Sequence, residues 1–177
     1  MDIPRIAKPA RNSQGIGQEA LICELDWLTT IAEPAGPFTN YGDDSIIGGN
    51  HVFATGKGFR KVYISNRSSK LMAKYMGGQD SRAVKPQLEA FMPVIDPVTT
   101  TFFSENKRYL VLVPDITCSS TRYIQIGTSC RGAEIPPDSV EMSSGVAESN
   151  EEAGHKFIID GFQDRIYFYE GTVTLYP

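Results

Sequence analysis

Residues 108–128, which read RYLVLVPDITCSSTRYIQIGT, carry the clearest structural signal in the chain. Residues 109–113 form an unbroken apolar run that is too short for an ordinary helix and rich in strand-favouring types, so they predict a strand buried on both faces. Residues 122–126 predict a second strand, and the Asp, Ser and Thr residues between the two favour turns. The stretch therefore predicts a β-hairpin with a long loop, at the centre of a β scaffold.

Alternating apolar residues and β-branched residues predict further strands on both sides of this hairpin. These strands cover residues 21–31, 51–55, 59–64, 86–93, 156–162 and 165–176. We expect Trp27 to point inward from the first strand, although the spacing of its Ile and Leu residues also fits a helix. A Gly-Lys-Gly turn is expected to join the second and third strands, and the last two strands are expected to form a hairpin. Residues 70–76 fit either a strand or two turns of helix.

One short helix is predicted at about residues 97–107. Asp96 is a favourable N-cap and Pro97 suits the first helical position. Lys107 and Arg108 are placed where the dipole at the end of a helix favours cations. Three consecutive threonines lower the helix propensity of the segment, so the helix should be short.

The predicted fold is therefore mainly β, a β-sandwich or barrel with one short flanking helix and long loops. Residues 1–18 contain few bulky anchors and are expected to form an extended N-terminal arm. Residues 19–177 are expected to form a single β-sandwich domain. Its long loops cover residues 32–50, which are rich in Gly and Pro, and residues 136–154, which are polar and acidic.

Composition excludes several classes of function. The chain of 177 residues has a formal net charge of −4 and no cluster of Lys and Arg, so a surface that binds nucleic acid tightly is not expected. The same mild acidity is compatible with a surface past which DNA slides without sticking. No run of 18 apolar residues and no apolar signal segment are found, so we expect a soluble chain that is synthesised in the cytoplasm and has no membrane partner.

Motifs for catalysis and metal binding are missing from the sequence. GxSxG, HExxH and a strand-borne GxGxxG do not occur, so we expect no enzyme, no catalytic residue and no cofactor. The three cysteines are widely spaced and have no nearby histidine, which argues against a metal site and leaves a Cys118–Cys130 disulfide open. The Asp43-Asp44 pair fits a solvated turn better than a cation site, because the alternating oxygen ligands of a calcium loop are absent.

The order of these elements resembles the tail tube (major tail) proteins of long-tailed bacteriophages and, more distantly, the tube proteins of contractile injection systems. The resemblance is carried by GKGFRKVY at residues 56–63, KPQLEAFMP at residues 85–93, the short helix, YLVLVPD at residues 109–115 and FYEGTVTLYP at residues 168–177. It covers most of the chain and depends on element order and loose local patterns.

The resemblance implies a structural virion protein that is synthesised in the host cytoplasm and located in the viral tail. Its copies would form rings, expected to be hexameric, that stack into a tail tube for DNA ejection. The implied partners are copies of the same chain, other virion tail proteins, and genomic DNA that passes through the lumen without specific binding. The arm and the first long loop then supply the candidate residues for contacts between copies, namely Ile3, Ile6, Ile16, Phe38, Tyr41, Ile46 and Ile47.

Three alternatives stay open at the level of sequence. A head–tail joining or tail-terminator protein would form single rings that do not stack. A monomeric ligand-binding or carbohydrate-binding β-sandwich would present a strip of exposed aromatic residues, for which Tyr167, Tyr169 and Tyr176 are candidates. An enzyme of an unrecognised type is the third alternative, although no residue can be assigned a catalytic role.

Overall fold

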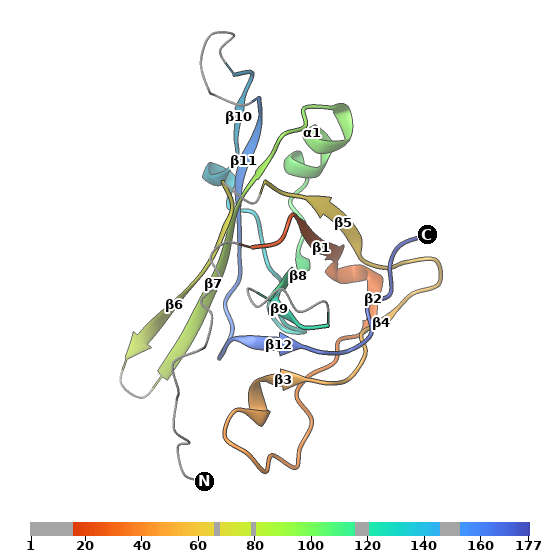
Figure 1. Cartoon of the computed structure of the whole chain (residues 1–177), viewed down its shortest axis with the longest axis vertical. Coiled ribbons are helices and arrows are strands. Elements are labelled where there is room, and N and C mark those ends of the chain that lie inside the picture. The colour runs from red at the N-terminus through yellow and green to blue at the C-terminus, as the bar shows by residue number, and fades with distance from the viewer. Residues whose placement is uncertain (1–15, 66–67, 79–80, 116–120, 146–152) are drawn as a thin grey trace.

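The computed structural model describes residues 16–65, 68–78, 81–115, 121–145 and 153–177, and this part of the chain is mainly β (Figure 1). The largest sheet has six strands in the order β3-β12-β9-β8-β1-β5. Its strands are β3 (Ile46–Ile47), β12 (Tyr167–Tyr169), β9 (Tyr123–Ile126), β8 (Tyr109–Pro114), β1 (Glu19–Glu24) and β5 (Arg60–Tyr63). All neighbours in this sheet are antiparallel except β12 and β3.

A second sheet has four antiparallel strands in the order β10-β11-β7-β6. Its strands are β10 (Glu141–Ser143), β11 (Gly154–Asp160), β7 (Ser81–Met92) and β6 (Lys70–Gly78). A small third sheet pairs β2 (Leu28–Thr30) with β4 (Val52–Phe53). The remaining elements are the 3-10 turns η1 (Leu25–Trp27), η2 (Asp43–Ser45) and η3 (Pro137–Ser139), and the helix α1 (Pro97–Ser104).

The central hairpin is confirmed. Strand β8 pairs antiparallel with β9, and its first five residues are buried, as expected for a strand covered on both faces. Successive side chains of a strand point to opposite faces. Val111 and Val113 therefore contribute to one hydrophobic cluster, whereas Leu110 and Leu112 contribute to another.

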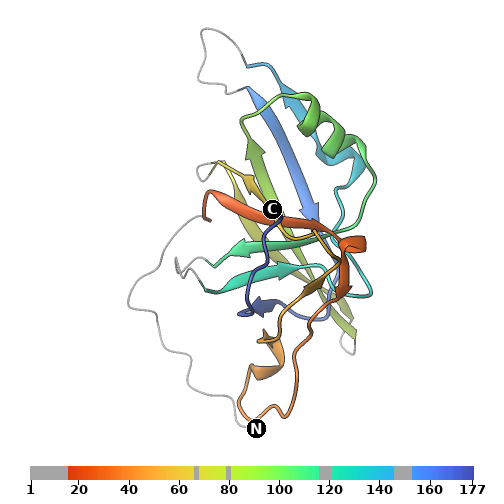
Figure 2. The same ribbon diagram turned by 90° about the vertical axis from the view of Figure 1, so that its right-hand side faces the viewer.

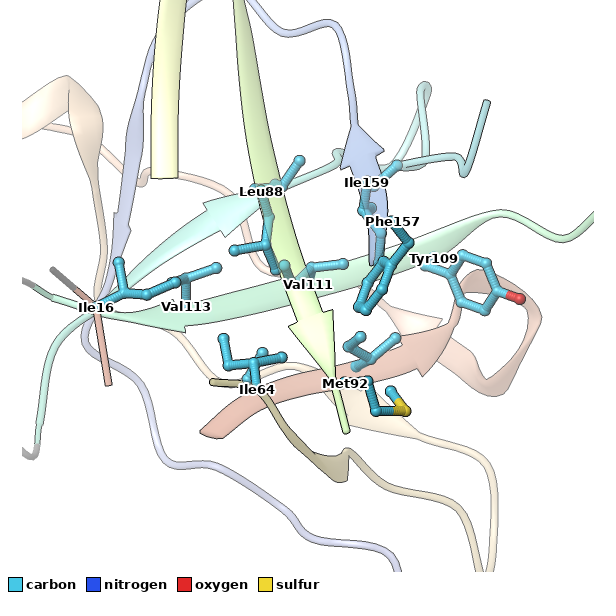
Figure 3. Packing of buried hydrophobic residues seen from close by; sticks show 14 residues of the cluster. Ile16, Ile64, Leu88, Met92, Tyr109, Val111, Val113, Phe157 and Ile159 are labelled. Carbon is cyan, nitrogen blue, oxygen red and sulfur yellow. The ribbon is translucent and has the colours of Figure 1, made fainter. Parts of the chain in front are cut away.

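The first cluster joins the two larger sheets. Val111, Val113 and Ile126 of the six-stranded sheet pack in it with Leu88 of β7 and Phe157 of β11, and Figure 3 shows labelled side chains from both sheets meeting there. Each fully buried side chain of this size contributes roughly 1.5–3 kcal/mol to folding. The two sheets are thus held face to face as a sandwich, and the mainly-β prediction is confirmed.

The second cluster lies on the opposite face of the six-stranded sheet. Leu110, Leu112 and Tyr169 are fully buried there. Trp27 and Phe53, from the segments that precede and form the small sheet, pack partly against the cluster. Trp27 therefore points inward, as predicted, but remains half-buried. The strand expected at residues 21–31 is interrupted by η1, which separates β1 from β2.

The helix is confirmed at its start and shorter at its end. The Asp96 carboxylate accepts a hydrogen bond from the Thr99 N–H at 2.7 Å, and the Thr99 hydroxyl accepts one from the Asp96 N–H at 3.1 Å, which completes a capping box. Helix α1 ends at Ser104, three residues before the predicted end. Lys107 therefore lies beyond the helix, where its ammonium group contacts the carboxylates of Glu24 and Glu105 at 3.0 and 2.7 Å.

Two predicted hairpins are wrong, because their strands join different sheets. Strand β4 pairs with β2 and β5 pairs with β1, so the Gly-Lys-Gly turn connects the small sheet to the large one. Strand β11 pairs with β10 and β7, whereas β12 pairs with β9 and β3. The turn after Asp160 thus carries the chain across the sandwich, and the last strand spans three residues, far fewer than the predicted twelve.

The structure also defines the segment that fits either a strand or a helix and the two long loops. Residues 70–78 form strand β6, not helical turns. The loop expected at residues 32–50 is irregular except for η2 and β3, and it lies at the end of the molecule opposite α1 (Figure 1). The loop expected at residues 136–154 contains η3 and β10, and residues 146–152 within it lie outside the described residues.

Candidate assembly surface

Both edges of the four-stranded sheet are open in the described part of the chain. Strand β10 pairs only with β11, and β6 pairs only with β7. One side of the backbone of β6 therefore presents N–H and C=O groups along nine residues without a neighbouring strand. A long open edge of this kind is a template for pairing with another chain.

The outer end of the β6–β7 hairpin stands away from the body of the protein. Nine residue pairs, from Lys70 with Glu89 to Gly78 with Ser81, hold it together. Gly77 adopts φ +104° next to the tip, a conformation that disfavours side chains. Leu71 is the one residue of β6 that is half-buried, and the other eight are exposed. Figure 1 shows the end of β6 and the start of β7 projecting away from the six-stranded sheet.

Large apolar side chains are exposed along this hairpin. Met72, Tyr75 and Met76 have exposed fractions of 39, 67 and 40%. Met72 and Met76 share a face of β6 with Lys70, and Tyr75 lies on the opposite face, so apolar side chains are exposed on both sides of the open edge. The exposed apolar side chains and the open backbone edge thus both favour contact of β6 with another chain.

The outward face of the four-stranded sheet carries paired charges. The Glu89 carboxylate lies 2.8 Å from the Lys70 ammonium group and 3.4 Å from that of Lys156. The hydrogen bond from Lys70 and the charges of both lysines hold the pKa of Glu89 below its ordinary value. Lys85 and Asp160 form a further pair at 2.8 Å. The described residues of this face therefore carry both signs of charge rather than an acidic field.

The long loop is held in shape by hydrogen bonds within it and is tied to the body by an ion pair. The Asp43 carboxylate accepts hydrogen bonds from the N–H groups of Thr39 and Asn40 at 3.0 and 2.8 Å, and these bonds lower its pKa. Asp44 forms an ion pair with Arg165. The carboxylates of both Asp43 and Asp44 are therefore used to hold the loop in place. The described residues contain no group of His, Cys, Asp and Glu that could hold a metal ion.

The structure divides the predicted contact residues into two groups. Phe38, Tyr41 and Ile46 are exposed, by 43, 59 and 37%, and remain available to a partner. Ile16 and Ile47 are buried in the two hydrophobic clusters, so they support the fold and are unavailable to a partner. The two other candidates, Ile3 and Ile6, lie outside the described residues. The exposed residues of β6 were missed, because KLMAKYM has no clear alternation and fits both a strand and two turns of helix.

The C-terminal tyrosines do not form an exposed strip. Tyr169 is fully buried and its hydroxyl donates a hydrogen bond to the Thr172 carbonyl at 2.8 Å. Tyr167 is half-buried and donates a hydrogen bond to the Asp164 carboxylate. Tyr176 is exposed by 39% and packs against Trp27. The arrangement expected of a carbohydrate-binding face is therefore absent at these three positions.

The described cysteines are free thiols, one buried and one exposed. Cys23 is a buried free thiol and burial raises its pKa to about 12, so it is unsuited to act as a nucleophile. Cys130 is an exposed free thiol, and Cys118 lies outside the described residues. Among the described residues, no helix has the length and apolar character needed to cross a membrane.

Comparisons with models of known protein families, with curated proteins and with solved structures gave no match to this chain.

Proposed function

We propose that this protein is a structural subunit of a viral tail, whose copies form closed rings that stack into a tube for DNA. The observation that carries the proposal is the four-stranded sheet with two open edges, β6 and β10. An edge on each side allows every copy to pair head-to-tail with the next one, and such contacts generate rings when the rotation closes. Ring closure also removes the aggregation hazard that open edges present in a monomer.

The long loop supports stacking of the rings. Its base is tied to the body by Asp44 with Arg165 and by the hydrogen bond from the Thr172 N–H to the Asn50 side chain at 2.7 Å. Its exposed aromatic residues Phe38 and Tyr41 are thus presented at one end of the molecule. A fixed loop loses less conformational entropy on binding than a free one. It is therefore suited to contact a copy in the adjacent ring.

The charge pairs on the outward face of the sheet fit a surface past which DNA moves. Lys70, Lys85 and Lys156 are bound to Glu89 and Asp160, so their charges are partly neutralised. Tight binding of DNA depends on lysines and arginines that are available to phosphates. If this face lines a lumen, it offers weak and non-specific contacts.

Mass photometry and negative-stain electron microscopy of the purified full chain test the proposal. We expect oligomers of one defined size that stack into hollow tubes as the concentration rises. Isolated rings at all concentrations would replace the tube with a head–tail joining or tail-terminator ring. A monomer that persists at high concentration would overturn both forms of the proposal.

A further inference from the structure

A cavity of about 700 Å³ lies between α1 and the edge of the six-stranded sheet formed by β1 and β5. Its walls are mainly apolar, and they include Trp27, Val62, Met92, Val98, Phe102 and Tyr109. This volume is within the range of cavities that bind small organic molecules, which are typically apolar with a few placed polar groups. The cavity exists because α1 covers this end of the sandwich incompletely. Phe102 packs against the first cluster, whereas Val98 remains 70% exposed.

The wall of the cavity contains a buried donor without a partner. Tyr109 is 2% exposed, and its hydroxyl makes no hydrogen bond with any described residue. Figure 3 shows this hydroxyl at the margin of the first cluster, directed away from the other labelled side chains. Burial raises the pKa of Tyr109 to about 12, so the hydroxyl keeps its proton and remains a donor. A buried polar group of this kind is a rare exception that calls for an explanation.

A cation without a carboxylate partner also lines the cavity. The guanidinium of Arg60 lies 5.1 Å from the ring of Trp27 and 4.5 Å from the ring of Tyr176, which hold it by cation–π contacts. No described carboxylate forms an ion pair with it. The acidic side chains that line the cavity, Glu24 and Glu105, are both bound to Lys107. An anion therefore meets one free positive charge and no free negative charge there.

Strand pairing places the two polar groups on one face of the sheet. Arg60 is opposite Ile22 and Tyr109 is opposite Glu24, and both partners belong to β1 with one residue between them. Residues two apart on a strand share a face. Arg60 and Tyr109 thus belong to the strands on either side of β1, with apolar side chains of the cavity wall between them, an arrangement that matches a molecule with an oxygen at each end of an apolar body.

We propose that this cavity binds a small amphipathic carboxylate whose carboxylate group contacts Arg60 and whose apolar body carries a second oxygen that accepts a hydrogen bond from Tyr109. Medium-chain hydroxy acids have this chemistry. The proposal is independent of assembly into rings, because it concerns one chain and a cavity away from the open edges of the four-stranded sheet.

Isothermal titration calorimetry of the full chain with decanoate, 10-hydroxydecanoate and 1-decanol tests the proposal. We expect decanoate to bind and to change the emission of Trp27, the only tryptophan, and we expect 1-decanol to bind at least about ten-fold more weakly. The second oxygen should improve affinity about five-fold, as expected for one hydrogen bond to a buried donor.

Three variants separate this site from general attraction to alkyl chains. Arg60→Gln should weaken binding of decanoate about ten-fold and leave that of 1-decanol unchanged, whereas Lys74→Gln, on the distant β6, should change neither. Tyr109→Phe should fold normally and lose the preference for 10-hydroxydecanoate over decanoate. Absence of decanoate binding to the natural chain, or equal binding of acid and alcohol, would overturn the proposal. Retention of the hydroxy-acid preference by Tyr109→Phe would also overturn it.

Discussion

His51 shows how a single buried polar residue ties the long loop to the core. Its Nδ1 accepts a hydrogen bond from the Ala32 N–H at 3.1 Å, so the proton of the neutral ring is on Nε2, which donates to the Gln125 side chain at 3.1 Å. The ring stacks on Tyr169 with 4.4 Å between ring centroids. Burial lowers the pKa of His51 from 6.5 to about 4. Folding therefore favours the neutral form.

This shift makes the stability of the protein depend on pH. Below about pH 6.5 the unfolded chain binds a proton at His51 that the folded chain rejects, so the contribution of His51 is complete above that pH and is lost as the pH falls to about 4. The loss should reach up to about 3 kcal/mol. Urea unfolding of the natural chain and of His51→Gln, at about pH 7.5 and about pH 4.5, measures it.

The difference between the two pH values should be smaller in His51→Gln than in the natural chain. Because carboxylates also titrate in this range, only the change in that difference reports on His51. An identical pH dependence in His51→Gln and the natural chain would show that His51 does not titrate as its surroundings imply.

At the scale of elements, two adjacent glycines in the β6–β7 hairpin have different roles. Gly77 has φ +104°, and a Cβ there would lie 1.9 Å from the Ser81 carbonyl oxygen. Among the described residues, a Cβ on Gly78 would meet no atom within 4 Å. Gly77→Ala should therefore lower the free energy of unfolding by about 1–3 kcal/mol, and Gly78→Ala should change it little. Chemical denaturation of both variants gives the comparison, and equal effects would contradict the distinction.

The capping box of α1 provides a second test at this scale. Asp96→Ala removes the acceptor for the Thr99 N–H and should lower the free energy of unfolding by about 1 kcal/mol. Asp138 provides the control, because it lies in η3, where no side-chain cap is formed. If Asp138→Ala is as costly as Asp96→Ala in thermal unfolding, the effect comes from lost surface charge rather than from the cap.

The sequence signals that succeeded are local ones. The apolar run of β8 and the Asp-Pro start of α1 each determine their own structure, because burial on both faces and capping depend on a few neighbouring residues. Local signals do not determine which sheet a strand joins. The turn after Asp160 permits a hairpin, yet Phe157 packs in the first cluster and Tyr169 in the second, so the strands they belong to join separate sheets.

The structure likewise leaves some of the candidate contact residues exposed and buries others. A Gly/Pro-rich loop gives no register, so the sequence does not distinguish exposed Ile46 from buried Ile47. Strand β10 was missed because all three of its residues are exposed and its neighbours are polar. The open edge of β6 could not be predicted at all, since an edge is defined by the absence of a neighbour in the assembled sheet.

For the whole molecule, substitutions in the two surfaces proposed for assembly should disrupt different steps of assembly. The double substitution Tyr75→Asp and Met76→Asp replaces two exposed apolar side chains of β6 with negatively charged ones. It should prevent ring formation and leave monomers. The control is Val52→Asp, which alters a residue of the small sheet that is 50% exposed. It should leave ring formation intact. Mass photometry measures both, and rings formed by the β6 variant would exclude that edge as a joint.

We propose that the loop tip acts in the stacking of rings rather than in ring closure. Phe38→Ser with Tyr41→Ser removes two exposed aromatic rings and leaves the Asp43 hydrogen bonds to the backbone of Thr39 and Asn40 in place, so the loop keeps its shape. We expect rings of the same mass as those of the natural chain, but no tubes in negative-stain images, because the apolar contact between rings is lost. Tubes of normal length would assign stacking to another surface, and loss of the rings themselves would place the loop in the joint between neighbours.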